Sequence, residues 1–555
     1  MIVFGLFVFA LVLVGFAVVR WMWRRVDPAG LDDTPVTELL NAGALAGAGG
    51  WLALNWILAL TGTLAASTLA AGVAAILGGA VVVLVRSRHR LRAMQVADET
   101  ARMLLVLVPL FIWVIFILWR GVVLPPASHD VLAYHLPKAV LLERAGGWEH
   151  FEAPDARISN YPYNYELLLA DVLILSGSDT YTEWIGTVSS LLMLLATAAF
   201  AQRWWRGSAA ATVAAVLAAA SAPVLLLHSG ADKNDLLVAW LAASALLWGS
   251  RWFVSGGRMP MALLIVALGI GLGTKTTIVA TGVALAPFLA WRAASRIRRR
   301  LLAPRDVALS AALALLLLLL GGGFTHFVTL FRTPGASDLT RVAETATTVT
   351  KISWGDWSNL WQVPYLLVTI PFGSNPQGVW VPWKGEAWFW PHYEIYFSHY
   401  GRLISILLFA VPFVMWKFAR GADESIRVER RITAAAAALA ILIMLPTVFR
   451  PLGFFGALAR YLAFVVPLIA AYTLPPLVDA LRGVNRRLAG GAMAVLAIVF
   501  SLEAAACAMN DRFAPVEYAV WAAEHPGTRF IHFYPYRAGS IVDRLAGPND
   551  SVAVD

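Results

Sequence analysis

Long apolar runs alternate with short polar segments along nearly the whole chain. A helix needs roughly 20 apolar residues to cross the hydrocarbon core of a membrane, because each residue adds about 1.5 Å of length. About fourteen runs approach or reach that length, so the pattern predicts an all-α, polytopic membrane protein. The expected spans are 2–20, 50–65, 68–86, 103–119, 182–201, 208–227, 233–250, 260–275, 277–291, 307–331, 402–418, 431–449, 458–477 and 487–507.

The run at 260–291 is too long for one span and short for two. GTKTT at 273–277 supplies a polar turn inside it, and basic residues stand before and after the run. Basic residues gather on one side of a membrane, so this arrangement predicts a hairpin whose two ends lie on the same side.

Three polar stretches between the apolar runs are expected on one side of the membrane. The first bears acidic and aromatic residues, and the third is rich in Trp and Tyr, which settle at membrane interfaces. The chain divides accordingly into N-terminal transmembrane helices of unassigned role, a main transmembrane domain and a small external tail too short for a core of its own. The loops are 120–181, 228–235 and 332–401, and the three parts are 1–102, 103–507 and 508–555.

Composition agrees with a membrane protein. The chain is 59% hydrophobic and 14% charged, with a mean hydropathy of +0.70, which excludes a soluble globular protein. Lys and Arg outnumber Asp and Glu by 43 to 34, but the strongly basic segments are the short loops on the side opposite the three stretches. The positive-inside rule explains this excess without a nucleic-acid partner. It also predicts a multi-pass membrane protein with the three stretches on the outer side. The composition, rich in Arg, Ala and Gly, suits a high-GC bacterium, in which the membrane would be the inner (plasma) membrane and the outer side periplasmic or extracellular.

A single cysteine, Cys507, excludes an intrachain disulfide and a Cys-rich metal site. The sequence does not assign a metal otherwise, because His129 and His135 are six residues apart and do not share a helix face.

Acidic residues begin two of the predicted helices. DVLAYHLPKAVLL, from Asp130, has the spacing of a short amphipathic helix on the membrane surface. Asp235 begins the apolar helix LLVAWLAASALL, with Asp232 and Lys233 about one turn before it. Each of the two helix-starting acids either caps its helix or faces a water-filled cavity as a functional carboxylate. Asp232 and Lys233 are alternatives to Asp235 as the working residue.

Other polar residues lie near these acids. Lys275 stands at the tip of an apolar hairpin, where a charge either marks a functional site or extends to the interface. His135 and Glu166 belong to the first loop, as do Tyr161 and Tyr163, which alternate with other residues. Such tyrosines either stack on sugars in an extended segment or anchor the chain at the interface.

The order of these motifs resembles the GT-C superfamily of membrane glycosyltransferases. It is most similar to the branch of the protein O-mannosyltransferases and the bacterial aminoarabinose transferase. The motifs are an external Asp followed by YHLP, the return SNYPYNYELLLADVL, the acid in KNDLLVAWLAASALL, GLGTKTTIVATGVALAP and ARYLAFVVPLIA, together covering about 103–477. The helices before residue 103 depart from this pattern.

The resemblance implies a function and a set of roles. Its members take a sugar from a polyprenyl-phosphate carrier at the outer face of the membrane and pass it, with inversion, to a lipid, glycan or protein acceptor. Asp130 matches the acid expected to act as base, and Asp235 the acid that binds the acceptor or a metal or orients Asp130. Lys275 and Arg460 match cations for the donor phosphate, the alternative for Arg460 being an ordinary loop arginine. Some members need a divalent cation and others do not, which leaves metal dependence open.

Two other functions fit a polytopic membrane protein of this size. A transporter or flippase of lipid-linked saccharide is one, although such proteins favour internal repeats and broken helices. A polymerase or ligase that uses a lipid-linked oligosaccharide is the other. The large acid- and aromatic-bearing external loop favours the glycosyltransferase.

Overall fold

The computed structural model describes residues 2–93, 105–300, 319–332, 401–418, 423–448 and 458–510, except for a few positions inside these ranges, and a few isolated residues elsewhere. The described residues form helices joined by turns and contain no strand. This confirms the all-α fold class. The expectations for the loop 332–401, for the tail beyond residue 510 and for Asp232 lie outside the described residues.

Eight of the described helices are long and apolar enough to cross a membrane, and four apolar helices are shorter. The eight spans lie in α1 (Ile2–Val26), α3 (Val36–Leu60), α4 (Ala66–Ala93), α10 (Trp184–Trp205), α13 (Asp235–Ser255), α15 (Ile278–Arg298), α23 (Val465–Val484) and α24 (Arg486–Asn510). The shorter apolar helices are α6 (Val108–Val123), α11 (Ala209–Ala220), α14 (Arg258–Thr274) and α20 (Gly401–Phe418). The other elements are α2 (Pro28–Asp32), η1 (Val131–His135), α7 (Leu136–Ala145), α8 (Ala156–Asn160), α9 (Asn164–Ser176), η2 (Asp179–Tyr181), α12 (Pro223–His228), η3 (Leu319–Gly323), α17 (Phe324–Arg332), α21 (Glu424–Val448) and α22 (Leu458–Tyr461).

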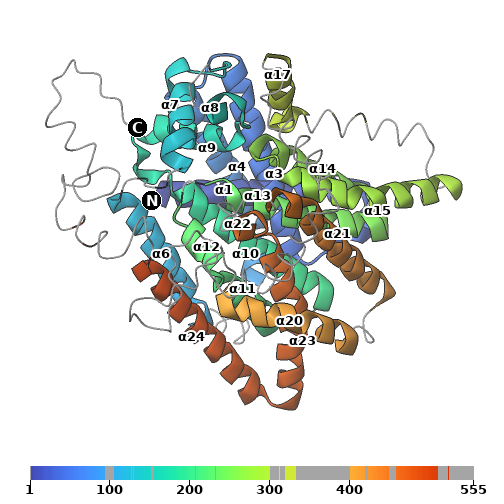
Figure 1. Cartoon of the computed structure of the whole chain (residues 1–555). Helices are drawn as coiled ribbons and strands as arrows, with labels where there is room; N and C mark the ends of the chain where they lie inside the picture. The colour runs from blue at the N-terminus through green and yellow to red at the C-terminus, as the bar shows by residue number, and fades with distance from the viewer. Residues whose placement is uncertain are drawn as a thin grey trace, which may run out of the picture.

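Helix α13 is the centre of the bundle. It is buried from Asp235 to Trp252 and packs against α10, α14, α15 and α21 (Figure 1). A helix that is apolar around its whole circumference must be surrounded by other helices. The residues at its two ends are therefore held inside the protein, one group at each end of the bundle.

The N-terminal helices pack through glycine. Gly15 of α1 lies so close to the backbone of Gly43 on α3 that a Cβ atom at Gly15 would overlap the Gly43 carbonyl oxygen. Gly47, one turn further along α3, is also too close to the Leu11 carbonyl of α1 for a Cβ atom. Small residues four apart allow helix backbones to approach closely in a membrane. The α1–α3 contact therefore depends on these glycines.

Three predicted spans differ clearly from the structure, one of them being 458–477, which is divided between α22 and α23. Helix α3 begins at Val36, about fourteen residues before the predicted start, because Glu38 and Asn41 are buried by polar partners on other helices and do not end the helix. The predicted span 208–227 is broken into α11 and α12 at Pro223, which begins α12 and holds the preceding residue extended. By contrast, the hairpin expected at 260–291 is present as α14 and α15, joined by a turn at Lys275.

The first large loop folds into short helices. Helices α7, α8 and α9 lie together at one end of the molecule, near α17 (Figure 1). The amphipathic helix expected from Asp130 is present as η1 and α7, and it ends at Gly146, whose positive φ of 62° suits glycine. This helical cap lies over the start of α13.

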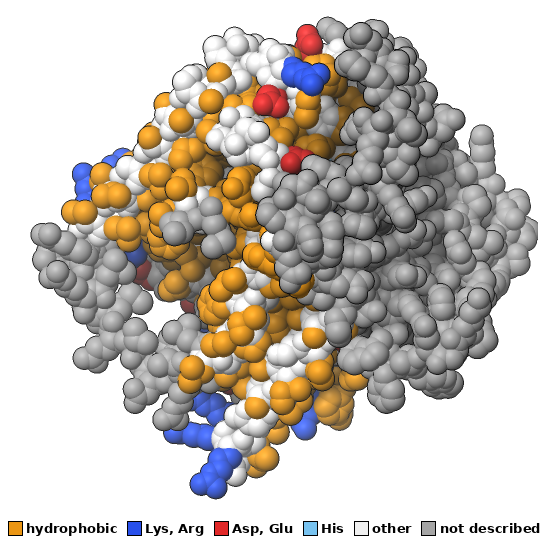
Figure 2. Space-filling view, turned by 90° about the vertical axis from the view of Figure 1, so that its left-hand side faces the viewer, with side chains coloured by type: hydrophobic (Ala, Val, Ile, Leu, Met, Phe, Trp, Pro, Cys, Tyr) orange, Lys and Arg blue, Asp and Glu red, His pale blue; other side chains and the backbone are white. Residues whose placement is uncertain are grey.

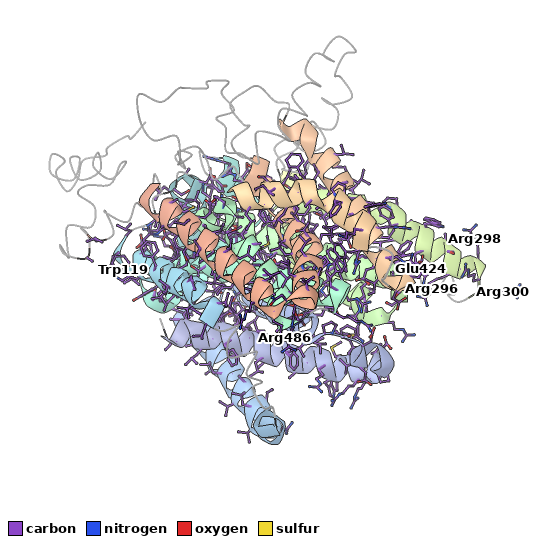
Figure 3. All side chains as sticks on the ribbon, turned by 90° about the horizontal axis from the view of Figure 1, so that it is seen from below. Trp119, Arg296, Arg298, Arg300, Glu424 and Arg486 are labelled. Carbon is purple, nitrogen blue, oxygen red and sulfur yellow. The ribbon has the colours of Figure 1, made fainter. Side chains whose placement is uncertain are left out.

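The outside of the bundle is apolar with basic ends. Hydrophobic side chains cover much of the described surface, and basic side chains gather at its lower end (Figure 2). The basic end of α15, with Arg296, Arg298 and Arg300, lies at one edge of the molecule beside Glu424 of α21 (Figure 3). An apolar belt between polar ends suits a protein that crosses a bilayer.

Candidate functional site

Six charged side chains meet at the end of the bundle where α13 begins. We call this group the Asp130 cluster: Asp130, Arg157, Lys233, Asp235, Lys275 and Arg460. They come from η1, α8, α13, α22 and the segments preceding α13 and α15. Residues far apart in the sequence are thus brought together, including the four that sequence analysis selected as two acids and two cations.

Asp130 stands before η1 but does not cap it, because its side chain accepts no hydrogen bond from the helix. Its Oδ2 instead accepts a hydrogen bond from Arg460 Nη1 at 3.0 Å and lies 3.5 Å from Lys233 Nζ. Its Oδ1 lies 3.9 Å from Arg157 Nη1. The capping alternative for Asp130 is therefore wrong, and its carboxylate is committed to cations.

Asp235 is the first residue of α13, while Asn234 holds the N-cap position. Its Oδ1 accepts a hydrogen bond from Lys275 Nζ at 2.5 Å, and Lys275 also donates to Asn234 Oδ1 at 3.0 Å. Arg460 Nε lies 3.8 Å from Asp235 Oδ2. The capping role expected as one alternative for Asp235 is thus filled by its neighbour, and Arg460 lies between the two acids.

The two carboxylates differ in access. The side chain of Asp235 is 2% exposed, whereas that of Asp130 is 21% exposed. Lys275 and Arg460 are 18% and 15% exposed. A molecule entering from outside can therefore reach Asp130 and the two cations, and it meets Asp235 only behind them.

Positive charge exceeds negative charge in the cluster. Burial alone would raise the pKa of Asp130, but the charges of Lys233 and Arg460 outweigh it and hold that pKa well below its usual range. Burial, together with Arg460, lowers the pKa of Lys233 to about 8. Among the described residues, four cations therefore face two ionised carboxylates near neutral pH. Such a surplus in a partly enclosed site attracts an anion.

The other residues selected from the first loop form a separate contact group. His135 Nδ1 and Glu166 Oε1 are 2.7 Å apart, and each side chain is 1% exposed. Tyr163 is also buried, with Lys138 Nζ 3.5 Å from its ring centre, while Tyr161 is half-buried against Tyr134. These contacts hold η1, α7 and α9 together. Their assignment to sugar or acceptor binding stays a prediction.

Sequence analysis missed some residues of the site. Arg157 lies on α8 and stacks over Tyr134 at 4.6 Å, and Tyr461 accepts a hydrogen bond from Arg460 Nη2 at 3.0 Å. His228 Nδ1 lies 3.9 Å from Asp235 Oδ2. Only Tyr461 carried a signal, since it neighbours Arg460 in the ARY motif. The other two contacts depend on how distant helices pack.

The described residues include no group of three or more His, Cys, Asp or Glu side chains placed to hold a metal ion. Here the carboxylates of the Asp130 cluster face lysine and arginine. Metal dependence is therefore a question for direct measurement.

Comparison with known proteins identifies similar solved structures. No protein-family model and no curated protein matches the sequence. The solved structure of ArnT from Cupriavidus metallidurans bound to undecaprenyl phosphate is similar, with 16% identity and a TM-score of 0.45, over 81% of this chain and 73% of that one. The apo structure of the same protein has 14% identity, a TM-score of 0.45 and the same coverage.

Proposed function

We propose that the protein is a GT-C type glycosyltransferase that transfers a sugar from a polyprenyl-phosphate-linked donor to an acceptor at the outer face of the membrane. The observation that carries the proposal is that the partly exposed cations Lys275 and Arg460 lie beside one accessible carboxylate, Asp130, in a cluster whose described residues carry more positive than negative charge. The motif order of the sequence supports it, and undecaprenyl phosphate, the ligand of the similar ArnT, has the chemistry expected of the donor's carrier.

The cations serve the leaving group. When the sugar departs from a polyprenyl phosphate, negative charge grows on the phosphate oxygens. Lys275 and Arg460 present N–H donors at the accessible side of the cluster, and the planar guanidinium of Arg460 suits two parallel bonds to a phosphate. We assign both to the donor phosphate. No general acid is needed for a leaving group that already carries charge.

Asp130 acts on the acceptor as a base, but its ion pairs with Arg460 and Lys233 must first weaken. A carboxylate whose pKa is held low by two cations is a weak base. Donor phosphate that draws Arg460 and Lys233 toward itself weakens their hold and raises the pKa of Asp130. The base therefore becomes effective only once the donor is bound. Asp130 then takes the acceptor proton as the new bond forms, and a single displacement gives inversion.

Asp235 holds the cations in place. It is buried, it pairs with Lys275 at 2.5 Å and it lies 3.8 Å from Arg460. Its charge lowers the cost of burying these two cations in a partly apolar site. We therefore assign Asp235 to positioning and Asp130 to proton transfer.

The test is sugar transfer in proteoliposomes. Wild type and Asp130→Asn are compared at matched amounts of folded protein, with radiolabelled polyprenyl-phosphate sugars and a crude acceptor extract. We expect the wild type to transfer sugar and Asp130→Asn to transfer it about a thousandfold more slowly.

Movement of the labelled lipid between leaflets is measured in the same vesicles. If no donor supports transfer while the wild type moves labelled lipid across the bilayer, the protein is a flippase and the proposal fails. Full transfer by Asp130→Asn would remove Asp130 from the mechanism.

A further inference from the structure

A second cavity lies away from the Asp130 cluster, at the seam between the N-terminal helices and the rest of the bundle. Its volume is about 460 Å³, within the range of small-molecule sites, roughly 300 to 1,000 Å³. Its walls come from α1, α3 and α4 on one side and from α9, α10 and α13 on the other. The N-terminal helices, which have no counterpart in the motif pattern, thus supply about half of a cavity.

The lining is apolar, with one carboxyl group. Asp171 of α9 is the single acidic residue among the lining residues, and none of them is Lys or Arg. Aromatic and aliphatic side chains such as Phe7, Trp51 and Leu192 form most of the wall. A phosphate group would find no cation there. The cavity therefore suits an uncharged molecule that is mostly hydrocarbon.

Asp171 offers that molecule a polar contact. Its Oδ2 accepts hydrogen bonds from Trp51 Nε1 at 2.8 Å and Asn55 Nδ2 at 2.5 Å, while its buried Oδ1 has no hydrogen-bond partner among the described residues. Burial raises the pKa of Asp171 to about 7 despite these two bonds. A hydroxyl group complements both forms of the carboxyl, because it can donate to the ionised form and accept from the protonated one.

The cavity reaches the apolar outside of the protein. Val3 and Leu175 line it and are nevertheless 66% and 44% exposed. On the same stretch of α1, Leu6 and Phe9 are 53% and 57% exposed. Exposed apolar side chains on a membrane-spanning helix face lipid. A molecule can thus enter from the bilayer without crossing water.

We propose that this cavity binds a membrane lipid whose hydrocarbon chain lies between α1, α3 and α10 and whose hydroxyl group contacts Asp171. The N-terminal helices then serve to build a lipid site beside the transferase bundle. This lipid is not the sugar donor, because the donor carries a phosphate and none of the described lining residues is a cation. The proposal therefore stands whether or not the protein transfers sugar.

The test uses a hexadecanol probe that carries a photoactivatable group and a clickable tag, with the full-length protein in lipid vesicles. After illumination, mass spectrometry locates the labelled peptides. We expect labels on the lining segments of α1, α3 and α10. Ala48→Phe and Val188→Phe, which fill the cavity from two helices, should reduce this labelling by about tenfold.

Matched controls keep the result interpretable if one filled variant misfolds. Ala53→Phe and Leu191→Phe add the same ring on the same two helices at exposed positions, and they should label as the wild type does. Labelling that stays unchanged in both filled variants would overturn the site.

The polar contact is tested with two further probes, the matching alkane and the matching alkyl phosphate. The wild type should prefer the alcohol over both, and Asp171→Leu should abolish the preference for alcohol over alkane. Equal labelling of the wild type by alcohol and alkane would remove the role of Asp171. Stronger labelling by the phosphate would show an anionic lipid and contradict the proposal.

Discussion

Two networks of charged side chains lie at opposite ends of α13, and they differ in balance. Asp235 begins this helix and Arg251 lies sixteen residues later, about 24 Å away along the axis. The Asp130 cluster surrounds Asp235, at the start of the helix. Arg251 belongs to a second group of side chains joined by ion pairs. We call this group the Glu38 cluster: Asp33, Glu38, Arg203, Arg206, Arg251 and Glu429.

The Glu38 cluster is balanced, and its central side chains are buried, whereas Asp33 and Arg206 at its edge are exposed. Three carboxylates face three arginines, and Arg203 donates to both oxygens of Glu429 at 3.0 to 3.2 Å. Arg251 pairs with Glu38 at 2.5 Å and also donates to Thr34. Glu38 and Glu429 are fully buried. The charges compensate one another within the protein, which joins α3 to α10, α13 and α21.

Among the described residues, the Asp130 cluster has more cations than carboxylates, and Asp130, Lys275 and Arg460 are partly exposed. Burying charge costs free energy, so a cluster with excess charge of one sign needs another interaction to offset that cost. In the Glu38 cluster the partners are all internal. In the Asp130 cluster the missing negative charge suits a ligand. The comparison teaches that charge balance among the described residues distinguishes the structural network from the candidate binding site.

Asp130→Asn should reduce the rate of sugar transfer more than any other change proposed for the two clusters, because it removes the base and one negative charge. The maximal rate of transfer should fall by about a thousandfold, while affinity for polyprenyl phosphate stays equal or rises, because the cluster becomes more positive. Rate and affinity are measured separately. Asp33→Asn, which neutralises the exposed acid of the Glu38 cluster, should change neither. A matching loss of phosphate affinity in Asp130→Asn would contradict the division of roles.

Removing a cation should chiefly affect donor binding. Arg460→Ala should weaken binding of polyprenyl phosphate by about a hundredfold, the worth of a charged, hydrogen-bonded contact. Fluorescence titration in detergent measures the affinity. Arg206→Ala, at the exposed arginine of the Glu38 cluster, is the control and should bind as the wild type does. Unchanged affinity in Arg460→Ala would remove it from the phosphate site.

The pH dependence of donor binding should follow Lys233. Its pKa is lowered to about 8, and a lysine is charged below its pKa and neutral above it. Affinity for polyprenyl phosphate should therefore fall severalfold as the pH rises through about 8. Lys233→Arg keeps its charge over this range and should remove the decline. A decline that persists in Lys233→Arg would place the titrating group elsewhere.

Glu429→Gln should have the smallest effect on transfer. It should instead lower the stability of the folded protein. The change leaves Arg203 without its bidentate partner, which should lower the free energy of unfolding by about 3 kcal/mol. Thermal unfolding in mild detergent measures the loss. Glu424→Gln on the same helix, where the side chain is 66% exposed, should change stability little. Transfer per folded molecule should equal that of the wild type.

Sequence patterns predicted much of the fold, because apolar length and turn residues are local properties. The hairpin at Lys275 and the helix after Asp130 follow from local spacing. The start of α3 was not predicted, because a glutamate such as Glu38 is typical of a loop. Its burial in a helix depends on its ion pair with Arg251, which is far along the chain. Local pattern cannot show a partner more than two hundred residues away.

The candidate site was predictable in part. Asp130, Asp235, Lys275 and Arg460 were selected one by one, and the structure brings them together. Their capping and loop alternatives could be decided only by contacts. Arg157 and the cavity at Asp171 carried no sequence signal, since both arise from packing between separate helices.

The most direct test of this account is sugar transfer by Asp130→Asn and Glu429→Gln in parallel proteoliposomes, each normalised to folded protein. The account predicts that Asp130→Asn loses transfer by about a thousandfold while Glu429→Gln keeps the wild-type rate. Equal losses in both variants, or none in either, would contradict the assignment of one network to chemistry and the other to structure.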